Sequence, residues 1–142
     1  IVRPTLVYGN KDPHNGYGPN QFIRSAKKKK IIKLFGNGEE KRDHIWVNDL
    51  SQMMYQIIYK NKKNIFGVVN LASGKIISFA KIATLIKKNI PKTNIKNLER
   101  KMPPPHNGYR PIDIGKFKKL STFKPRSLSF VLKKIIKNYK EI

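Results

Sequence analysis

Gly36-Asn-Gly-Glu-Glu-Lys-Arg-Asp-His-Ile-Trp-Val-Asn-Asp49 contains the clearest folding signals of this chain. The two glycines at its start predict a turn, and residues 42–47 have the composition of a strand. Asn48 or Asp49 is suited to cap a helix at the end of that strand. The helix would carry these apolar residues on one face: Leu50, Met53, Met54, Ile57 and Ile58. A strand that leads directly into a helix is a common unit of α/β proteins.

Strands and helices alternate on both sides of this stretch. Further strands are expected at residues 1–9, 31–35, 66–71 and 93–98. Helices are expected to begin at Pro19, after Ser78 and after Ser127, each with apolar residues at 3.6-residue spacing. Between the last two helices, Pro103-Pro104-Pro105 predicts an extended loop with few backbone hydrogen bonds. The alternation predicts an α/β protein.

Composition limits the class of protein. With 142 residues, 39% of them hydrophobic, the chain is long enough to bury the core of one domain. No run approaches the ~20 apolar residues that a membrane helix needs, and no signal-peptide pattern is present, so a cytoplasmic protein is expected. Cysteine is absent, which excludes disulfides, thiolate metal sites and cysteine nucleophiles. His14, His44 and His106 are too far apart to suggest metal-ligand spacing, and no metal site is predicted.

The net charge of +23, from 31 Lys and Arg against 8 Asp and Glu, has two interpretations. A partner such as nucleic acid would explain it. However, the lysines are spread in pairs and short runs along the whole chain, mostly where a helix would present its solvent face or its C-terminal end. No arm, repeat or aromatic-basic platform accompanies them. A solvated basic surface is the favoured interpretation, and a module that binds nucleic acid or another polyanion is the alternative.

Arg42 and Arg110 are the candidate binding residues. A guanidinium group is planar, stays charged, and presents donors that match two phosphate oxygens. Both arginines are therefore candidates for a phosphate clamp. The alternative for Arg42 is a surface ion pair with Asp43, Glu39 or Glu40, which would contribute little to stability. Spacing alone does not separate these two interpretations.

Two apparent motifs do not support a catalytic role. Tyr59 and Lys63 have the Tyr-x-x-x-Lys spacing of a proton-transfer pair, but they fall in a lysine-rich run at an expected helix end. Gly16-Tyr-Gly18 resembles the start of a dinucleotide-binding loop, yet Gln21 stands where the third glycine is needed. No Ser, His and Asp set and no pair of carboxylates has suggestive spacing. The sequence therefore predicts no catalytic residue.

Six short motifs occur in a characteristic order along the chain. They are Arg3-Pro4 with Val7-Tyr8-Gly9, Phe22-Ile23, Phe35-Gly36-x-Gly38, Arg42-Asp43 with Val47 and Asp49, Val69-Asn70-Leu71-x-Ser73-Gly74, and Arg110-x-x-Asp113-x-x-Lys116 with Pro125 and Leu128. Together they resemble the extended short-chain dehydrogenase/reductases, which are NAD(P)-dependent nucleotide-sugar epimerases, dehydratases and reductases. The resemblance covers essentially the whole chain.

The resemblance implies that this chain is the C-terminal part of such an enzyme. It would hold the substrate-binding lobe and the last strands of a Rossmann-type parallel sheet, without the N-terminal cofactor-binding part. Residues 1–9 and about 65–72 would belong to the sheet, and residues 10–64 and 73–142 to the lobe. The glycine-rich loop and catalytic Tyr-x-x-x-Lys of the family are not found, so the chain alone is expected to be inactive. NAD or NADP would serve the intact enzyme, with none bound by this segment alone, and Pro4 is the one residue assigned to the cofactor.

The resemblance also implies which residues contact the substrate, a nucleotide-diphosphate sugar. Arg42 would contact the diphosphate, and Arg110 would close on the same group. The other predicted contacts are His44, Asn20, Gln21 and Phe22. Leu6 and Asn10 depart from the residues that many relatives carry at these positions. Because a fragment would leave apolar faces uncovered, a homodimer or another contact that covers them is also expected, or else marginal stability.

Overall fold

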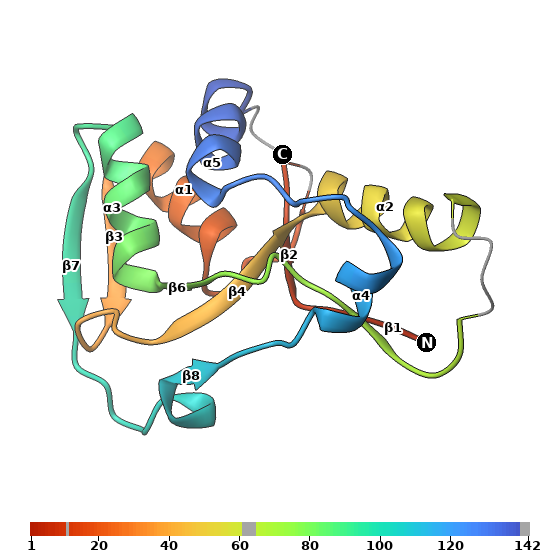
Figure 1. Ribbon diagram of the computed structural model, residues 1–142. Coiled ribbons are helices and arrows are strands. Elements are labelled where there is room, and N and C mark those ends of the chain that lie inside the picture. The colour runs from red at the N-terminus through yellow and green to blue at the C-terminus, as the bar shows by residue number, and fades with distance from the viewer. Residues whose placement is uncertain (11, 61–64, 140–142) are drawn as a thin grey trace.

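The computed structural model of the protein describes residues 1–10, 12–60 and 65–139 (Figure 1). Lys63 of the Tyr-x-x-x-Lys spacing lies outside these residues. The strands are β1 (Val2–Pro4), β2 (Leu6–Tyr8), β3 (Ile31–Phe35), β4 (Lys41–Trp46), β5 (Val69–Leu71), β6 (Ile76–Ser78), β7 (Asn94–Leu98) and β8 (Tyr109–Arg110). The α-helices are α1 (Pro19–Lys28), α2 (Val47–Tyr55), α3 (Phe79–Asn89), α4 (Gly115–Leu120) and α5 (Leu128–Lys137). A π-helical turn, η1 (Gln56–Lys60), continues α2, and a 3₁₀ turn, η2 (Pro105–Gly108), precedes β8.

Strand β4 is the centre of the sheet that carries the candidate site. It pairs in parallel with β2 and with the two-residue β8, and antiparallel with β6. Because β6 and β8 both pair with residues 41–42, they occupy opposite edges of β4. Separately, β1 pairs with β5 and β3 with β7, both in parallel. Parallel strand pairs with helices between them confirm the predicted α/β class.

The single strand predicted for residues 1–9 is in fact two strands with different partners. The break falls at Thr5, whose backbone N–H donates to the carbonyl oxygen of Leu71 (3.1 Å). The Thr5 hydroxyl donates to the carbonyl oxygen of Asp43 (2.9 Å). Thr5 therefore passes the chain from β5 to β4, and both partners are distant in sequence, so no local pattern marks the break.

The predicted starts of three helices are confirmed. Helix α1 begins at Pro19, where the missing N–H of proline costs nothing. The Ser78 hydroxyl accepts the backbone N–H of Lys81 (3.2 Å) at the start of α3. The Ser127 hydroxyl accepts the backbone N–H of Phe130 (3.3 Å) at the start of α5. Each cap bonds a residue three positions along the chain, which is why the sequence alone locates it.

The cap predicted for α2 is wrong. The helix begins at Val47, ahead of Asn48 and Asp49, and no side chain caps it. Asp49 instead lies in the first turn with 1% of its surface exposed. Its carboxylate accepts the backbone N–H of Arg126 (2.7 Å) and pairs with the Arg126 guanidinium. The aspartate thus holds the segment before α5 against α2, a contact that a local capping rule does not predict.

The elements that the sequence patterns missed are short. Strands β6 and β8 and helix α4 have 3, 2 and 6 residues, too few for a periodic pattern. The strand predicted at 66–71 begins only at Val69. The extended loop predicted at 103–105 leads directly into η2, where His106 and Asn107 have positive φ angles of 54° and 51°. This turn immediately precedes β8, which carries Arg110.

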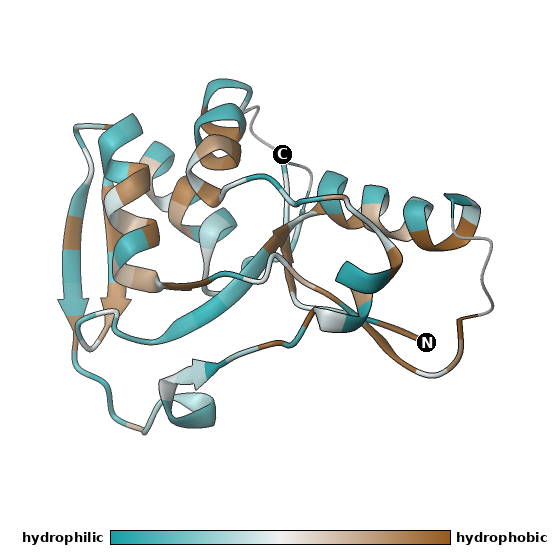
Figure 2. Cartoon of the chain, viewed as in Figure 1, coloured by the Kyte–Doolittle hydropathy of each residue, from teal (hydrophilic) through white to brown (hydrophobic). Residues whose placement is uncertain are grey.

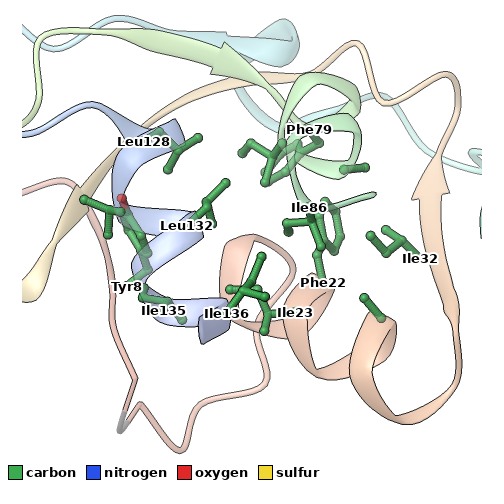
Figure 3. Close-up of a cluster of buried hydrophobic side chains, with 14 of the residues drawn as sticks. Tyr8, Phe22, Ile23, Ile32, Phe79, Ile86, Leu128, Leu132, Ile135 and Ile136 are labelled. Atoms are coloured by element: carbon green, nitrogen blue, oxygen red, sulfur yellow. The ribbon is translucent and has the colours of Figure 1, made fainter. Parts of the chain in front are cut away.

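The main core lies between α1, α3 and α5, with β3 beside them. Figure 3 shows the helices directing these side chains toward one another: Phe22, Ile23, Phe79, Ile86, Leu132 and Ile136. A second, smaller cluster contains Ile45, Met53, Val69, Leu71 and Phe117.

Apolar residues at the N-terminal end, brown in Figure 2, are exposed, including Ile1 and Val2. Within the described residues, no helix combines the length and apolar character needed to cross a membrane.

Candidate functional site

Arg42 is held in a buried position on β4. It is 7% exposed, and its Nη1 donates to the carbonyl oxygen of Lys41 (2.8 Å). Its Nη2 donates to the carbonyl oxygen of Pro105 (2.7 Å) and lies 2.5 Å from Oε1 of Glu40. Glu40 is one of the three ion-pair partners that the sequence offered for Arg42. The pair is buried, however, and does not lie on the surface. Arg42 is thus oriented before any ligand arrives.

Arg110 lies directly beside Arg42. The register of β8 on β4 pairs the two residues, so their side chains leave the same face of strands about 4.8 Å apart. Arg110 is exposed, and its Nη1 is 3.4 Å from Nε2 of His106. Like charges directly opposite each other on neighbouring strands are unfavourable. The pairing of two arginines therefore favours a site that receives an anion.

Both arginines line a cleft of about 560 Å³, a volume typical of small-molecule sites. Its aromatic side contains Tyr17, Phe35 and Phe79, with the Tyr17 ring 5.1 Å from Phe35 and 4.5 Å from Phe79. The Tyr17 hydroxyl accepts the backbone N–H of Phe35 (3.1 Å), which fixes the ring. Phe35 is 43% exposed and offers an apolar surface beside the cations. The cleft is suited to a ligand that is anionic in one part and flat or apolar in another.

A third arginine, Arg100, reaches the same cleft from the segment after β7. Its Nη2 is 3.3 Å from Oε2 of Glu40 and donates to the carbonyl oxygen of Phe35 (3.3 Å). This residue was not predicted from the sequence, because the chain around it contains no motif. Glu40 therefore bridges two arginines, Arg42 through one oxygen and Arg100 through the other.

Asp43, next to Arg42, has a structural position. Although it borders the cleft, it is 2% exposed. Its two carboxylate oxygens accept the backbone N–H groups of Ser73 (2.8 Å) and Lys75 (3.0 Å). Burial raises the pKa of Asp43, and these backbone hydrogen bonds partly offset that effect. The carboxylate attaches the 73–75 turn to β4, which gives Asp43 a structural role.

The structure places the other predicted contacts away from the arginine cleft. Phe22 is 1% exposed in the main core. Asn20 lines a separate cavity of about 40 Å³, where its amide donates to the Asp12 carboxylate. Gln21 is half-buried on α1 and does not line the cleft. Pro4, assigned to the cofactor, lies at the edge of the arginine cleft and also lines an adjoining groove.

His44 is buried two residues beyond Arg42 and also does not line the cleft. It is 6% exposed, and neither ring nitrogen has a hydrogen-bond partner. Its ring meets Phe79 edge to face at 5.7 Å. Burial lowers the pKa of His44 to about 4, so the imidazole is neutral at pH 7.

Within the described ranges, no group of three or more His, Cys, Asp or Glu residues is placed to hold a metal ion.

Comparison with known families identifies the class of protein. The model of the NAD dependent epimerase/dehydratase family matches residues 1–72, which include both strands of the split N-terminal segment and the whole of β4. The chain belongs to this family. Comparison with curated proteins gives no match.

Solved structures of epimerases and dehydratases share the fold. UDP-glucuronic acid 4-epimerase from Bacillus cereus, in complex with UDP-glucuronic acid and NAD, is 25% identical with a TM-score of 0.80. UDP-N-acetylglucosamine 4-epimerase from Methanobrevibacter ruminantium is 22% identical with a TM-score of 0.76. For both, the match covers 96% of this chain and 44% of the other. A dTDP-glucose 4,6-dehydratase from Bacillus anthracis, in complex with NAD, is 18% identical with a TM-score of 0.79, over 96% of this chain and 42% of the other. This chain thus spans less than half the length of these enzymes.

Proposed function

We propose that this chain is the nucleotide-sugar-binding portion of an NAD-dependent epimerase, dehydratase or reductase, and that Arg42 and Arg110 clamp the substrate diphosphate. The observation that carries this proposal is the register of β8 on β4, which sets the two arginines side by side. A diphosphate offers oxygens to both guanidinium groups and relieves the repulsion between them. Family membership supports a nucleotide sugar as the source of that diphosphate.

The rest of the cleft is suited to the other parts of such a substrate. Tyr17 and Phe35 provide a fixed aromatic surface against which a base can pack. Pro4, Thr5 and Leu6 form another part of the wall and belong to the strand segment predicted to join the cofactor sheet. We infer that the sugar lies toward these residues. The clamp then acts by positioning, because holding the diphosphate restricts where the sugar carbon can lie, and such positioning lowers a reaction barrier by several kcal/mol.

NAD or NADP would supply the hydride acceptor in the intact enzyme. Pro4 lies where the arginine cleft meets the adjoining groove, so it fits a residue at the border between substrate and cofactor. The other residues of this chain bind and orient the substrate. In this arrangement residues 1–9 and 65–72 belong to the cofactor sheet, and residues 10–64 and 73–142 to the substrate-binding lobe.

The exposed apolar residues suggest a surface that is covered in the intact protein. Strands β1 and β2 expose Val2, Leu6 and Val7, and the helical segment α2–η1 exposes Val47, Met54, Tyr55, Ile58 and Tyr59. We propose that the cofactor-binding part of the enzyme or a second copy of the chain covers them. A monodisperse monomer of the isolated chain, stable in light scattering and thermal denaturation, would contradict this assignment.

Calorimetry with nucleoside diphosphates tests the proposed function. The full-length protein is titrated with UDP, dTDP, GDP and ADP and with the matching nucleosides. We expect at least one diphosphate to bind at least about 100-fold more tightly than its nucleoside, because the clamp contributes more than one charge-assisted hydrogen bond. The proposal fails if no diphosphate binds better than its nucleoside.

The net charge of +23 favours a second candidate, a polyanion-binding module. The same protein is therefore titrated with duplex DNA and with the best nucleoside diphosphate over a range of salt concentrations. A clamp of two arginines gives a shallow dependence of affinity on salt, whereas contact with many backbone phosphates gives a steep one. Tight, steeply salt-dependent DNA binding without diphosphate binding would favour the second candidate.

A further inference from the structure

Glu40 is placed to compete with the ligand for Arg42. Glu40 is 8% exposed, and it lines the cleft together with Arg42 and Arg100. One carboxylate oxygen pairs with Arg42 at 2.5 Å and the other with Arg100 at 3.3 Å. The two arginines come from segments that are far apart in the chain, so a single carboxylate joins β4 to the segment after β7.

The neighbouring carboxylate, Asp43, binds the backbone instead. Asp43 also borders the cleft, but its two oxygens accept the backbone N–H groups of Ser73 and Lys75. Glu40 therefore supplies the one negative charge that Arg42 and Arg100 share, while Arg110 has a contact with His106 instead. Without Glu40, Arg42 would lose its carboxylate partner, and Arg100 would keep only its longer contact with the exposed Glu39 (3.7 Å between Nε and Oε1) among the described ion pairs.

The same contact restricts how Arg42 can hold a phosphate. Its Nη2 serves both Glu40 and the carbonyl oxygen of Pro105, and its Nη1 donates to Lys41. A two-pronged hydrogen bond from this guanidinium to a phosphate needs Nη2. A phosphate that approaches Arg42 also meets the negative charge of Glu40, and juxtaposed like charges oppose binding.

We propose that Glu40 is a built-in counter-ion of the cleft, which Arg42 releases when a diphosphate binds and which Arg100 then retains. This inference rests on the proposed function, because it assumes that the ligand is a diphosphate at Arg42 and Arg110. In the empty protein Glu40 stabilises the converging arginines. In the complex, Arg100 keeps the carboxylate paired, so that no buried charge is left without a partner. Glu40 and Arg100 thereby set the affinity of the cleft without needing to touch the sugar or the base.

The variant Glu40→Gln tests the proposal with inorganic pyrophosphate as the probe. Glutamine keeps the size and one acceptor of the side chain but removes its charge. In calorimetry on the full-length protein, we expect pyrophosphate to bind about tenfold more tightly to this variant than to the wild type. A merely structural role for Glu40 cannot produce this result, because damage to the cleft weakens binding. Unchanged or weaker binding overturns the proposal.

Glu99→Gln is the matched control. Glu99 precedes Arg100, is exposed and does not line the cleft, and the substitution changes the net charge by the same amount. We expect its affinity for pyrophosphate to stay within about twofold of the wild type, because exposed charges are screened by solvent. If Glu99→Gln tightens binding as much as Glu40→Gln, net charge alone explains the effect and the proposal is overturned.

Arg100→Gln provides a second test that does not depend on the folding of the Glu40 variant. It leaves Glu40 with Arg42 as its arginine partner and removes one positive charge, so we expect about fivefold weaker binding of pyrophosphate. Wild-type affinity in this variant overturns the proposal. Arg42→Ala and Arg110→Ala distinguish this failure from that of the proposed function. If neither weakens binding, the diphosphate clamp itself is wrong; if both do but Glu40→Gln does not tighten it, only the counter-ion is wrong.

Discussion

Replacing Arg42 by alanine is expected to weaken both ligand binding and folding, because the same guanidinium group is proposed to serve both. Arg42 contacts the carbonyl oxygens of Lys41 and Pro105 and the carboxylate of Glu40, and the side chains of the ion pair are 9% and 10% exposed. Breaking a buried ion pair by removing one partner costs about 3 to 5 kcal/mol. Because Glu40 keeps Arg100 as a partner, we expect the lower end, a loss of about 3 kcal/mol in the free energy of unfolding.

The loss of affinity is separate from this loss of stability. A hydrogen bond to a charged group contributes about 1.5 to 3 kcal/mol, so Arg42→Ala is expected to weaken binding of a nucleoside diphosphate by about 10- to 150-fold. Stability is measured by urea denaturation, and affinity by calorimetry at a temperature where the variant remains folded. The full-length protein is used for both.

Arg3→Ala is the matched control for this experiment. Arg3 is exposed on β1, donates to the side-chain oxygen of Asn70 (3.2 Å), and does not line the arginine cleft. The control removes the same charge, and we expect its affinity for the diphosphate to stay within about twofold of the wild type. The clamp assignment is refuted if folded Arg42→Ala binds the diphosphate as tightly as the wild type, or if Arg3→Ala loses as much affinity.

Three further predictions concern single side chains. Arg110→Ala should weaken diphosphate binding in calorimetry by about tenfold but shift the unfolding midpoint little, because Arg110 is exposed; a large loss of stability would contradict its placement. The His44 pKa falls from 6.5 to about 4 on folding, so the unfolded chain binds the extra proton and stability decreases as pH falls from 6.5 toward 4. Between pH 7.5 and 5 this linkage amounts to about 2 kcal/mol in urea denaturation, and His44→Phe should abolish that part; an identical pH dependence in the variant would show that His44 is not responsible. Ser127→Ala should lower stability by about 1 kcal/mol through loss of the α5 cap, with no change in diphosphate affinity, and wild-type stability would contradict the cap.

The sequence motifs predicted only some of the residues of the candidate site. They predicted a common ligand for Arg42 and Arg110, and the structure sets these two residues in register on neighbouring strands. They did not identify Arg100, which lies in a segment without a motif and enters the cleft through its contact with Glu40. Nor did they separate side chains that face the cleft from those that face the core. Phe22 belongs to the same α1 entry as the predicted contacts, yet it is buried between helices.

Local chemistry explains what the sequence determined by itself: the α/β alternation, the starts of α1, α3 and α5, and the glycine turn before β4. Each depends on hydrogen bonds and dihedral preferences within about four residues, so the relevant atoms are near one another in the chain. The tertiary structure alone decided the break at Thr5, the use of Asp49 to hold Arg126, and the bridge from Glu40 to two arginines. Those contacts join segments that are far apart in the chain, and no periodic pattern in the sequence indicates which segments will meet. Their partners are selected when the core packs and the strands pair, because only then do polar groups from distant segments come within reach of one another.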